Sequence, residues 1–322
     1  MSIHVYGPVP SRRLGKSLGI DCCPPLPNKT CNFNCVYCQL GRTRHFTNQR
    51  REFFPVANLI KEVERRVETV GKSNIDYLTL VGDGEPTLYL KMGELINGIK
   101  NNWGISVCVI TNGALLYDEK VRDELLNVDI IMPTLDAGIE KEFKLINRPI
   151  RHINFNEMVK GMIQFRDSFD GKIWMEFMAV GGINDHFDSL EKTRQLYEKI
   201  RPDRIYVNTP IRPPAEVWVK TPSLENMDLI ERVLGPSAKK GIFLINLSEE
   251  GDFYIEGEKE REIIQSLAQT IKRHPMRQDQ VDKVLEDKYI KNKLEIINQL
   301  TELKIEKKKF HDKVFFVYTD IE

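Results

Sequence analysis

Apolar residues along most of the chain follow two alternating spacings, one typical of strands and one typical of helices. Short, mostly apolar runs predict buried strands at residues 18–23, 75–82, 105–113, 128–137, 171–180 and 204–210. Between them, apolar residues three and four positions apart predict amphipathic helices, for example at residues 56–70, 155–169 and 189–200. A further helix and a terminal strand are expected at residues 222–235 and 241–247. Such alternation is typical of an α/β fold with a parallel sheet, here with six β/α units.

The pattern changes near residue 272, which divides the chain into predicted parts. Residues 1–256 carry the β/α units, and residues 257–271 predict a charged helical connector. Residues 272–322 contain two helical patterns and then a hairpin pattern, at residues 276–287, 292–303 and 304–320. Helix, helix and hairpin are the parts of a winged helix-turn-helix, so we expect a small C-terminal winged-helix-like domain.

The charges of the whole chain balance, with 47 Lys and Arg against 47 Asp and Glu. This excludes a chain-wide attraction to polyanions, although residues 1–55 are locally basic, with eight basic and two acidic residues. No run approaches the roughly 18 consecutive apolar residues of a membrane helix, and the first residues lack the apolar core of an export signal. We therefore expect a cytoplasmic protein with no membrane partner.

Five of the six cysteines lie between residues 22 and 38, which suits a metal site better than a disulfide framework. Cys31, Cys35 and Cys38 have the spacing C-x3-C-x2-C within a polar loop, residues 28–42. Three thiolates on one loop can hold three irons of a 4Fe–4S cubane and leave the fourth iron open. A zinc site completed by His45 and simple core packing are the alternatives.

Polar residues stand at the ends of five successive predicted strands: Gly84, Glu85, Thr111, Asn112, Asp136, Glu176 and Asn208. In β/α barrels the carboxyl ends of the strands form the active site. Each of these residues alone could be a turn former or a helix cap. Their recurrence predicts a functional site at this edge of the sheet.

Two motifs together resemble the radical S-adenosylmethionine (SAM) superfamily. The first is the cysteine loop, with the aromatic Tyr37 before its last cysteine, and the second is Gly84-Glu85-Pro86 after the second strand. The resemblance covers residues 15–245 and implies a partial (β/α)6 barrel. It also implies that Cys31, Cys35 and Cys38 bind a 4Fe–4S cluster whose open iron is chelated by the methionine part of SAM.

The resemblance further implies a reaction and a set of SAM contacts. One electron from the cluster cleaves SAM, and the 5′-deoxyadenosyl radical abstracts a hydrogen from a substrate. Gly84, Glu85 and Pro86 would bind the amino group of SAM, and Tyr37 would contact the adenine. Thr111, Asn112 and Asp136 would face the ribose or carboxylate, and Glu176 and Asn208 would point into the barrel mouth. Asn112 could equally stabilise the turn after its strand.

Several other segments resemble a branch grouped with the wyosine-forming tRNA enzymes: YGPVPSRRLGKSLGID, GDGEPTL, INRP and NTPIRPPAE. Those enzymes carry a further N-terminal cysteine triad, whereas this chain has only the vicinal Cys22 and Cys23, so we expect other chemistry. The vicinal pair is expected to be structural, with a redox role as the alternative, and Cys108 to be buried packing. Arg12, Arg13 and Arg212 form either an anion site or a cover over the cluster loop.

Partners follow from the resemblance and from the C-terminal part. A one-electron reductant such as flavodoxin or ferredoxin is implied, and a winged helix favours RNA or a protein or peptide as the substrate. Lys307, Lys308 and Lys309 begin the wing, where they could contact phosphates or form a solvated turn. A second hypothesis is an iron–sulfur redox-sensing regulator that binds DNA, and a third is a zinc-bound scaffold.

Overall fold

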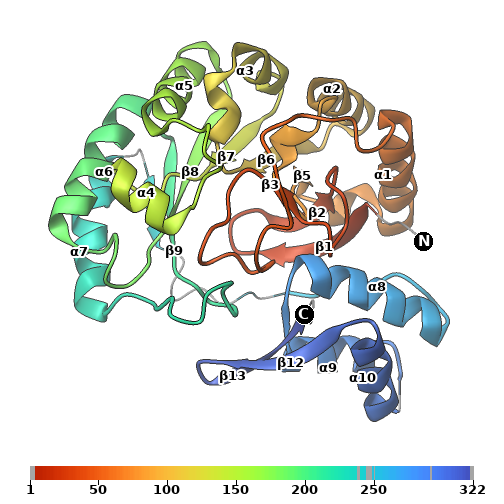
Figure 1. Cartoon of the computed structure of the whole chain (residues 1–322). Coiled ribbons are helices and arrows are strands. Elements are labelled where there is room, and N and C mark those ends of the chain that lie inside the picture. Colours follow the sequence, from red (N-terminus) through yellow and green to blue (C-terminus); the bar gives the residue numbers. More distant parts are fainter. Residues whose placement is uncertain (1–3, 238–239, 244–248, 250, 291, 320–322) are drawn as a thin grey trace.

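The main element of the fold is a curled, mostly parallel sheet of eight strands in the order β1-β2-β5-β6-β7-β8-β9-β10 (Figure 1). The structure is a computed structural model that describes residues 4–237, 240–243, 249, 251–290 and 292–319. Its strands are β1 (Val5–Ser11), β2 (Gly15–Ile20), β5 (Tyr77–Leu80), β6 (Ser106–Thr111), β7 (Ile130–Pro133), β8 (Lys172–Met178), β9 (Arg204–Asn208) and β10 (Lys240–Phe243).

The parallel part of the sheet has seven strands, the number that six β/α units and the expected terminal strand give together. The seventh is β10, which pairs in parallel with β9; residues 244–247 of the expected terminal strand lie outside the described residues. β1 pairs antiparallel with β2, with a register shift between Tyr6 and Val9. It was not predicted because its two prolines and one glycine break a strand pattern. The observed architecture is therefore a seven-stranded parallel half-barrel with one antiparallel edge strand.

Helices cover the outer face of the half-barrel because each presents an apolar stripe to it. In α1, Leu59, Val63 and Val67 recur every four residues and pack in one core with Leu78 and Leu80 of β5. The surrounding helices are α1 (Val56–Val70), α2 (Met92–Trp103), α3 (Glu119–Leu125), α5 (Phe155–Ser168), α6 (Phe187–Ile200) and α7 (Leu224–Leu234). The short helices are α4 (Glu140–Ile146), η1 (Lys72–Asn74), η2 (Pro86–Leu88), η3 (Ala114–Tyr117) and η4 (Gly235–Ser237).

The inner face of the half-barrel is filled at one level by a separate apolar cluster. Leu14, from the turn between β1 and β2, packs there against residues of four strands: Cys108, Ile130, Met132, Trp174 and Tyr206. Because side chains alternate between the two faces of a strand, Glu176 lies on the same face as Trp174, and Asn208 on the same face as Tyr206. The interior is therefore apolar at this level and polar nearer the strand ends.

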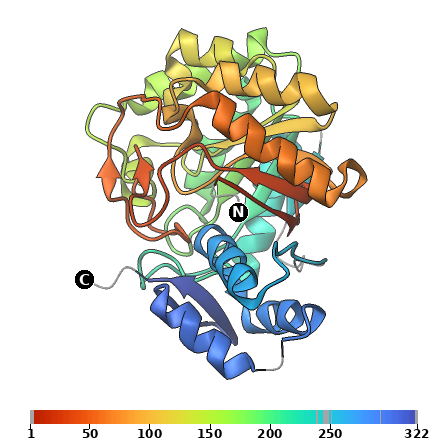
Figure 2. The ribbon, with the colours of Figure 1, turned by 90° about the vertical axis from the view of Figure 1, so that its right-hand side faces the viewer.

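The C-terminal segment forms a small unit of three helices and a three-stranded antiparallel sheet, ordered β11-β13-β12. Its elements are α8 (Glu260–Arg273), β11 (Met276–Arg277), α9 (Gln278–Asp287), α10 (Lys293–Glu302), β12 (Ile305–Phe310) and β13 (Lys313–Tyr318). The region expected as a connector is mostly α8. Its buried Leu267 and Ile271 share a core with Tyr6 and Val9 of β1 and with Phe316. This unit therefore packs against the edge of the half-barrel (Figures 1 and 2).

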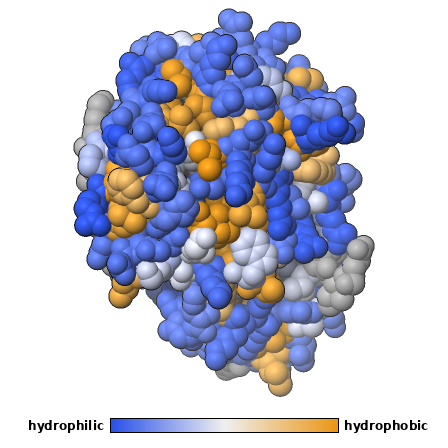
Figure 3. Space-filling model, turned by 60° about the vertical axis from the view of Figure 1, so that its left-hand side comes forward, coloured by the Kyte–Doolittle hydropathy of each residue, from blue (hydrophilic) through white to orange (hydrophobic). Residues whose placement is uncertain are grey.

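Among the described residues, no helix is both long enough and apolar enough to cross a bilayer. The face that carries α4, α6 and α7 has apolar atoms gathered around a central hollow within a hydrophilic surround (Figure 3). Exposed apolar side chains on these elements include Leu145 of α4 and Phe187 of α6. An apolar centre inside a polar rim is typical of an interaction surface.

Candidate functional site

The cysteine loop lies across the carboxyl edge of the sheet, next to α4. Its first strand, β3 (Thr30–Cys31), pairs with β4 (His45–Phe46) and bridges to Gly84 after β5. The backbone N–H groups of Asn34 and Val36 donate to the carbonyls of Asn147 (3.0 Å) and Ile146 (2.9 Å) at the end of α4. The loop is therefore fixed at both sides by backbone hydrogen bonds.

Nitrogen donors point at all three cysteine sulfurs of the loop. Lys29 Nζ lies 3.1 Å from Cys38 Sγ, and the backbone N–H of Phe33 lies 3.4 Å from Cys31 Sγ. The side-chain amides of Asn112 and Asn147 lie 3.6 Å from Cys31 Sγ and Cys35 Sγ. Hydrogen bonds to the sulfurs and burial tune the reduction potential of an iron–sulfur cluster. This donor set therefore suits thiolates bound to iron.

The buried cation of Lys29 also favours thiolates at Cys31 and Cys38. Lys29 is only 3% exposed, and its second contact is with the carbonyl of Gly41 at 2.6 Å, which aims the ammonium at the loop interior. Burial raises the pKa of Cys31 to about 12, and the Lys29 ammonium opposes that shift. Metal coordination deprotonates a thiol outright, so binding of a metal group at this loop releases protons.

The donor set fits a cluster better than it fits zinc. Among the residues that the structure describes, no three His, Cys, Asp or Glu side chains converge on a single ion position. A cubane needs no such convergence, because each thiolate binds a different iron. His45, the fourth ligand of the zinc alternative, is exposed and its Nε2 lies 3.4 Å from Asn28 Oδ1. Cys31, Cys35 and Cys38 could therefore hold a 4Fe–4S cluster, one iron each.

Glu85 lies beside this loop and is 2% exposed. Its Oε1 accepts hydrogen bonds from the backbone N–H of Thr87 (3.0 Å) and from the hydroxyls of Thr87 and Thr111, and its Oε2 accepts from the N–H of Asn112 (2.8 Å). Burial raises the pKa of Glu85, and these hydrogen bonds oppose the shift. The carboxylate thus caps η2 at Pro86 and joins the ends of β5 and β6, and within the described part of the chain Oε2 has a single donor.

Gly84 is required where the strand end meets the loop. An added Cβ would lie 2.1 Å from the carbonyl oxygen of Thr30, which is much closer than real Cβ contacts. Asn112 has contacts of both expected kinds: its Oδ1 accepts from the N–H of Ala114 (2.9 Å) in a turn, and its Nδ2 donates to Asn32 Oδ1 (2.6 Å) in the loop. The segments that follow β5 and β6 therefore both contact the cysteine loop directly.

Asp136 connects the loop to the end of α4 and to the end of β8. Its Oδ2 accepts from the hydroxyl of Tyr37 (2.6 Å) and the amide of Asn147 (2.7 Å), and its Oδ1 accepts from the N–H of Met178 (2.7 Å). Burial raises the pKa of Asp136 to about 6, and these three hydrogen bonds oppose the shift. The carboxylate positions Tyr37, so a direct contact of Asp136 with SAM remains a prediction. Asn147 belongs to the INRP segment, but no role had been expected for it.

Glu176 and Asn208 lie together in the barrel interior, as their strand positions predict. Asn208 Nδ2 donates to Glu176 Oε1 at 3.2 Å, and the same carboxylate forms an ion pair with Arg13. Arg13 is one residue before Leu14 in the turn that enters the half-barrel. The turn thus brings a cation to Glu176, a pairing that strand-end reasoning did not anticipate.

Contacts within the protein hold the other residues that the sequence analysis named, namely an arginine and the cysteines outside the loop. Arg212 pairs with Glu249 and donates to Gln39 Oε1 (2.9 Å) and the carbonyl of Pro275 (3.0 Å). It therefore ties the loop after β9 to the cysteine loop and the C-terminal unit. Cys22, Cys23 and Cys108 are at most 1% exposed, in line with packing roles.

A buried charge cluster lies behind the loop and joins it to the C-terminal unit. Arg273, the last residue of α8, has its Nε 2.8 Å from Asp21 Oδ2 and an Nη 3.5 Å from Asp83 Oδ2. Asp21 follows β2 directly, and Asp83 precedes Gly84-Glu85. The carbonyl of Arg273 accepts from Gln39 Nε2 at 3.1 Å. One residue of the C-terminal unit therefore contacts three segments around the site.

Comparison with known proteins agrees with this geometry. A family model described as the radical SAM superfamily matches residues 26–196, which include the cysteine loop and the ends of β5, β6, β7 and β8. UPF0026 protein MJ1312 from Methanocaldococcus jannaschii is 36% identical over 313 residues, covering 97% of this chain and 95% of the relative. The similarity to this relative therefore includes the C-terminal unit.

One solved structure shares the fold at low sequence identity. A radical SAM methyltransferase from Sphaerobacter thermophilus superposes with a TM-score of 0.54 and 15% identity, over 70% of this chain and 65% of that chain. TYW1 with a lysine-pyruvate adduct bound is a distant structural neighbour, with a TM-score of 0.49 and 16% identity over 69% of this chain and 74% of that chain. The first match supports the half-barrel fold alone.

Proposed function

This chain belongs to the radical SAM superfamily and, within it, to the UPF0026 family, and from that membership we propose that it is an enzyme that cleaves SAM reductively. A 4Fe–4S cluster held by Cys31, Cys35 and Cys38 would supply the electron that breaks the sulfonium bond and yields a 5′-deoxyadenosyl radical. The observation that carries the proposal is the set of nitrogen donors aimed at the three sulfurs, at the carboxyl edge of a parallel half-barrel.

The residues around the cluster position have separate tasks in this proposal. Lys29 stabilises the negative charge of the thiolates. The second acceptor position of Glu85 Oε2, with the backbone of Gly84 and Pro86, receives the ammonium group of SAM. Asp136 holds Tyr37 in place against the adenine, and Thr111 and Asn112 fix Glu85. The buried side chains around the site keep water away from the radical and so protect it from side reactions.

The first test is the reaction itself. Anaerobically reconstituted protein, reduced with dithionite and supplied with SAM, is expected to form 5′-deoxyadenosine, measured by liquid chromatography and mass spectrometry. The formation requires both reductant and cluster, so omission of dithionite is the control. A reconstituted protein that binds four irons and SAM but forms no 5′-deoxyadenosine contradicts the proposal.

The role of Glu85 is tested by Glu85→Gln, which keeps the shape and removes the charge. A hydrogen bond to a charged group contributes about 1.5–3 kcal/mol, so SAM affinity is expected to fall about 10- to 150-fold. The amide must also turn its NH₂ toward one of the present donors, so the melting temperature falls as well. Iron content is expected to stay at the wild-type value, because Glu85 binds no iron.

The matched control is Glu68→Gln on the exposed face of α1, which should change neither SAM affinity nor the melting temperature. If Glu85→Gln lowers the melting temperature and leaves SAM affinity unchanged, Glu85 is only a cap and a strand connector. SAM affinity is measured by equilibrium dialysis on the reconstituted protein.

For the substrate we propose a protein or peptide that the C-terminal unit binds as a winged helix. The order α8, β11, α9, α10, β12, β13 and the sheet order β11-β13-β12 support the winged-helix assignment. On α10 and just before it, Leu294 is 69% and Tyr289 91% exposed. Exposed apolar residues suit a protein partner. Among the helix residues Lys293–Glu302, one Lys accompanies two Glu, which disfavours both nucleic acid and the DNA-binding regulator.

Kinship with wyosine-forming enzymes remains a hypothesis that this substrate assignment does not require. The RNA alternative predicts that the reconstituted protein binds transfer RNA and that Leu294→Asp leaves the binding unchanged. The peptide assignment predicts that Leu294→Asp weakens capture of the native substrate and leaves SAM cleavage intact. The test is anaerobic co-purification with wild type and variant, with the bound partner identified by mass.

A further inference from the structure

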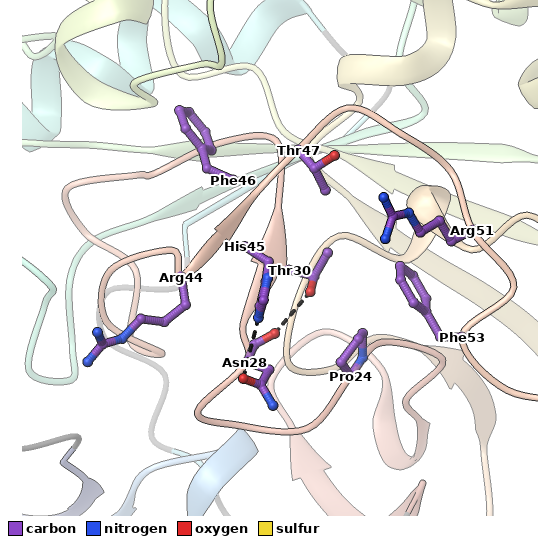
Figure 4. A pocket seen from close by; sticks show the side chains of 9 residues that line it. All are labelled: Pro24, Asn28, Thr30, Arg44, His45, Phe46, Thr47, Arg51 and Phe53. Carbon is purple, nitrogen blue, oxygen red and sulfur yellow. Dashed lines mark hydrogen bonds between the residues drawn. The ribbon is translucent and has the colours of Figure 1, made fainter.

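A hollow of about 750 Å³ opens beside the cysteine loop (Figure 4). We call it the loop hollow; its lining includes Thr30, Arg44, His45, Phe46, Arg51 and Phe53. None of the inward-facing residues Arg13, Glu176 and Asn208 lines it. A group bound in the loop hollow would therefore lie outside the barrel interior, where a radical would meet its substrate.

The lining of the loop hollow is basic and aromatic. Arg44 and Arg51 are exposed there with His45, and no Asp or Glu is among the described residues that line it. Phe46 is 43% exposed, which is high for a large aromatic side chain. Positive charge around an exposed aromatic residue is typical of a surface that meets an acidic partner.

The loop hollow also lies next to a cluster ligand. Phe46 of β4 is paired directly with Cys31 of β3, and the N–H of Thr47 donates to the carbonyl of Cys31 at 3.1 Å. Neighbouring strands lie about 4.8 Å apart, so a partner seated on Phe46 is separated from the Cys31 strand by a single strand spacing. Cys31 is itself half-buried. The surface therefore offers a short path from outside the protein to one ligand.

We propose that the loop hollow is the docking site of an acidic one-electron carrier protein of the flavin or iron–sulfur type. The inference rests on the proposed function, because reductive SAM cleavage requires one electron that neither SAM nor the substrate supplies. The carrier is oxidised by one electron and the group held by Cys31, Cys35 and Cys38 is reduced by one electron. No bond of this chain forms or breaks in that step.

Single-stranded RNA is the other ligand that arginine and aromatic side chains suit. The pairing of Phe46 with Cys31 favours the electron carrier. An RNA substrate would have to reach the barrel interior, and closeness to Cys31 would not help it to do so. An electron carrier needs this closeness and needs no access to the interior. Positive charge also speeds encounter with an acidic carrier, an effect that salt weakens.

The test compares two reductants on the reconstituted full-length protein. The measured quantity is the ratio of the 5′-deoxyadenosine rate with limiting reduced flavodoxin to the rate with dithionite. Arg51→Glu is expected to lower this ratio about tenfold by repelling the acidic carrier. Phe46→Ala should also lower this ratio. For this variant the ratio should stay low when reduced flavodoxin is saturating. Arg261→Glu, on the exposed face of α8, is the matched control and should leave the ratio at the wild-type value.

The outcomes separate this inference from the proposed function. If wild-type protein forms no 5′-deoxyadenosine with dithionite, the proposed function fails. If dithionite works and the ratio for Arg51→Glu and Phe46→Ala equals that of the control, docking at the loop hollow is overturned. Labelled single-stranded RNA that binds wild type but not Arg51→Glu, with an unchanged ratio, assigns the hollow to nucleic acid and also overturns the inference. Rising salt should lower the wild-type ratio more than that of Arg51→Glu.

Discussion

Cys35→Ala is expected to remove the iron–sulfur cluster altogether, and with it SAM cleavage. The loop has three thiols for three irons, and two thiolates cannot hold the group that three define. After anaerobic reconstitution the variant should contain background iron and sulfide and lack the charge-transfer absorbance of a 4Fe–4S cluster. Its 5′-deoxyadenosine formation should fall to the level of protein without iron.

The control for this variant is Cys108→Ala, which changes a buried cysteine outside the loop. Cys108 is 0% exposed in the inner apolar cluster, so the loss of its sulfur should lower stability but leave the iron content at the wild-type value. A Cys35→Ala protein with full iron, sulfide and absorbance would show that Cys35 is not a ligand. Zinc without iron in the wild-type protein would favour the scaffold hypothesis.

Residues that act through a local pattern could be predicted from the sequence. The three loop cysteines are within eight positions of one another, and the strand ends follow short apolar runs, so spacing alone groups them. Asn112 contacts Asn32 of the loop, and the N–H of Glu85 donates to the carbonyl of Thr30 at 3.0 Å, so both lie at the expected edge of the sheet. The actual hydrogen-bond partners of Glu85 were not predictable, because they depend on how β5 and β6 align.

Residues that act through distant partners could not be predicted. Asn147 contacts Cys35 across 112 positions, and Arg273 contacts Asp21 across 252 positions. The spacing of apolar residues gives no information about such a pair, and the charges of residues 257–271 predicted only a charged helical connector. The burial of Leu267 and Ile271 shows that α8 has a core-facing stripe as well as a charged face. A charged helix was therefore identified correctly as a helix, but its packing was not.

The packing of α8 bears on the stability of a shortened chain. A chain that ends near residue 270 lacks Arg273, and it leaves Asp21 and Asp83 buried without their cation. It also lacks Ile271 and Phe316, which share a core with Tyr6 and Val9. We therefore expect the half-barrel to depend on the C-terminal unit for stability, although the division of the chain into domains remains a prediction.

Arg273→Met is expected to lower the free energy of unfolding by about 3–5 kcal/mol, the usual cost of removing one partner from a buried ion pair. The Arg273 side chain is 1% exposed, and those of Asp21 and Asp83 are at most 1% exposed, so water cannot replace the lost charge. Urea unfolding of the full-length protein, followed by far-UV circular dichroism, measures the change. Arg261→Met, exposed on the same helix, is the control and should change stability by less than about 0.5 kcal/mol.

The pH dependence and a rescue distinguish lost charge pairing from lost packing in Arg273→Met. Burial raises the pKa of Asp21 and of Asp83 above their usual values, and Arg273 opposes both shifts. Without Arg273 the folded variant binds more protons than its unfolded chain above about pH 4, so its stability falls as the pH rises. The deficit relative to wild type should therefore be larger at about pH 8 than at about pH 5. Asp21→Asn with Asp83→Asn should recover more than half of the deficit, because the neutral pair needs no cation. A deficit that is independent of pH and not relieved by these substitutions would mean that Arg273 stabilises the protein through its packing, and not through its charge.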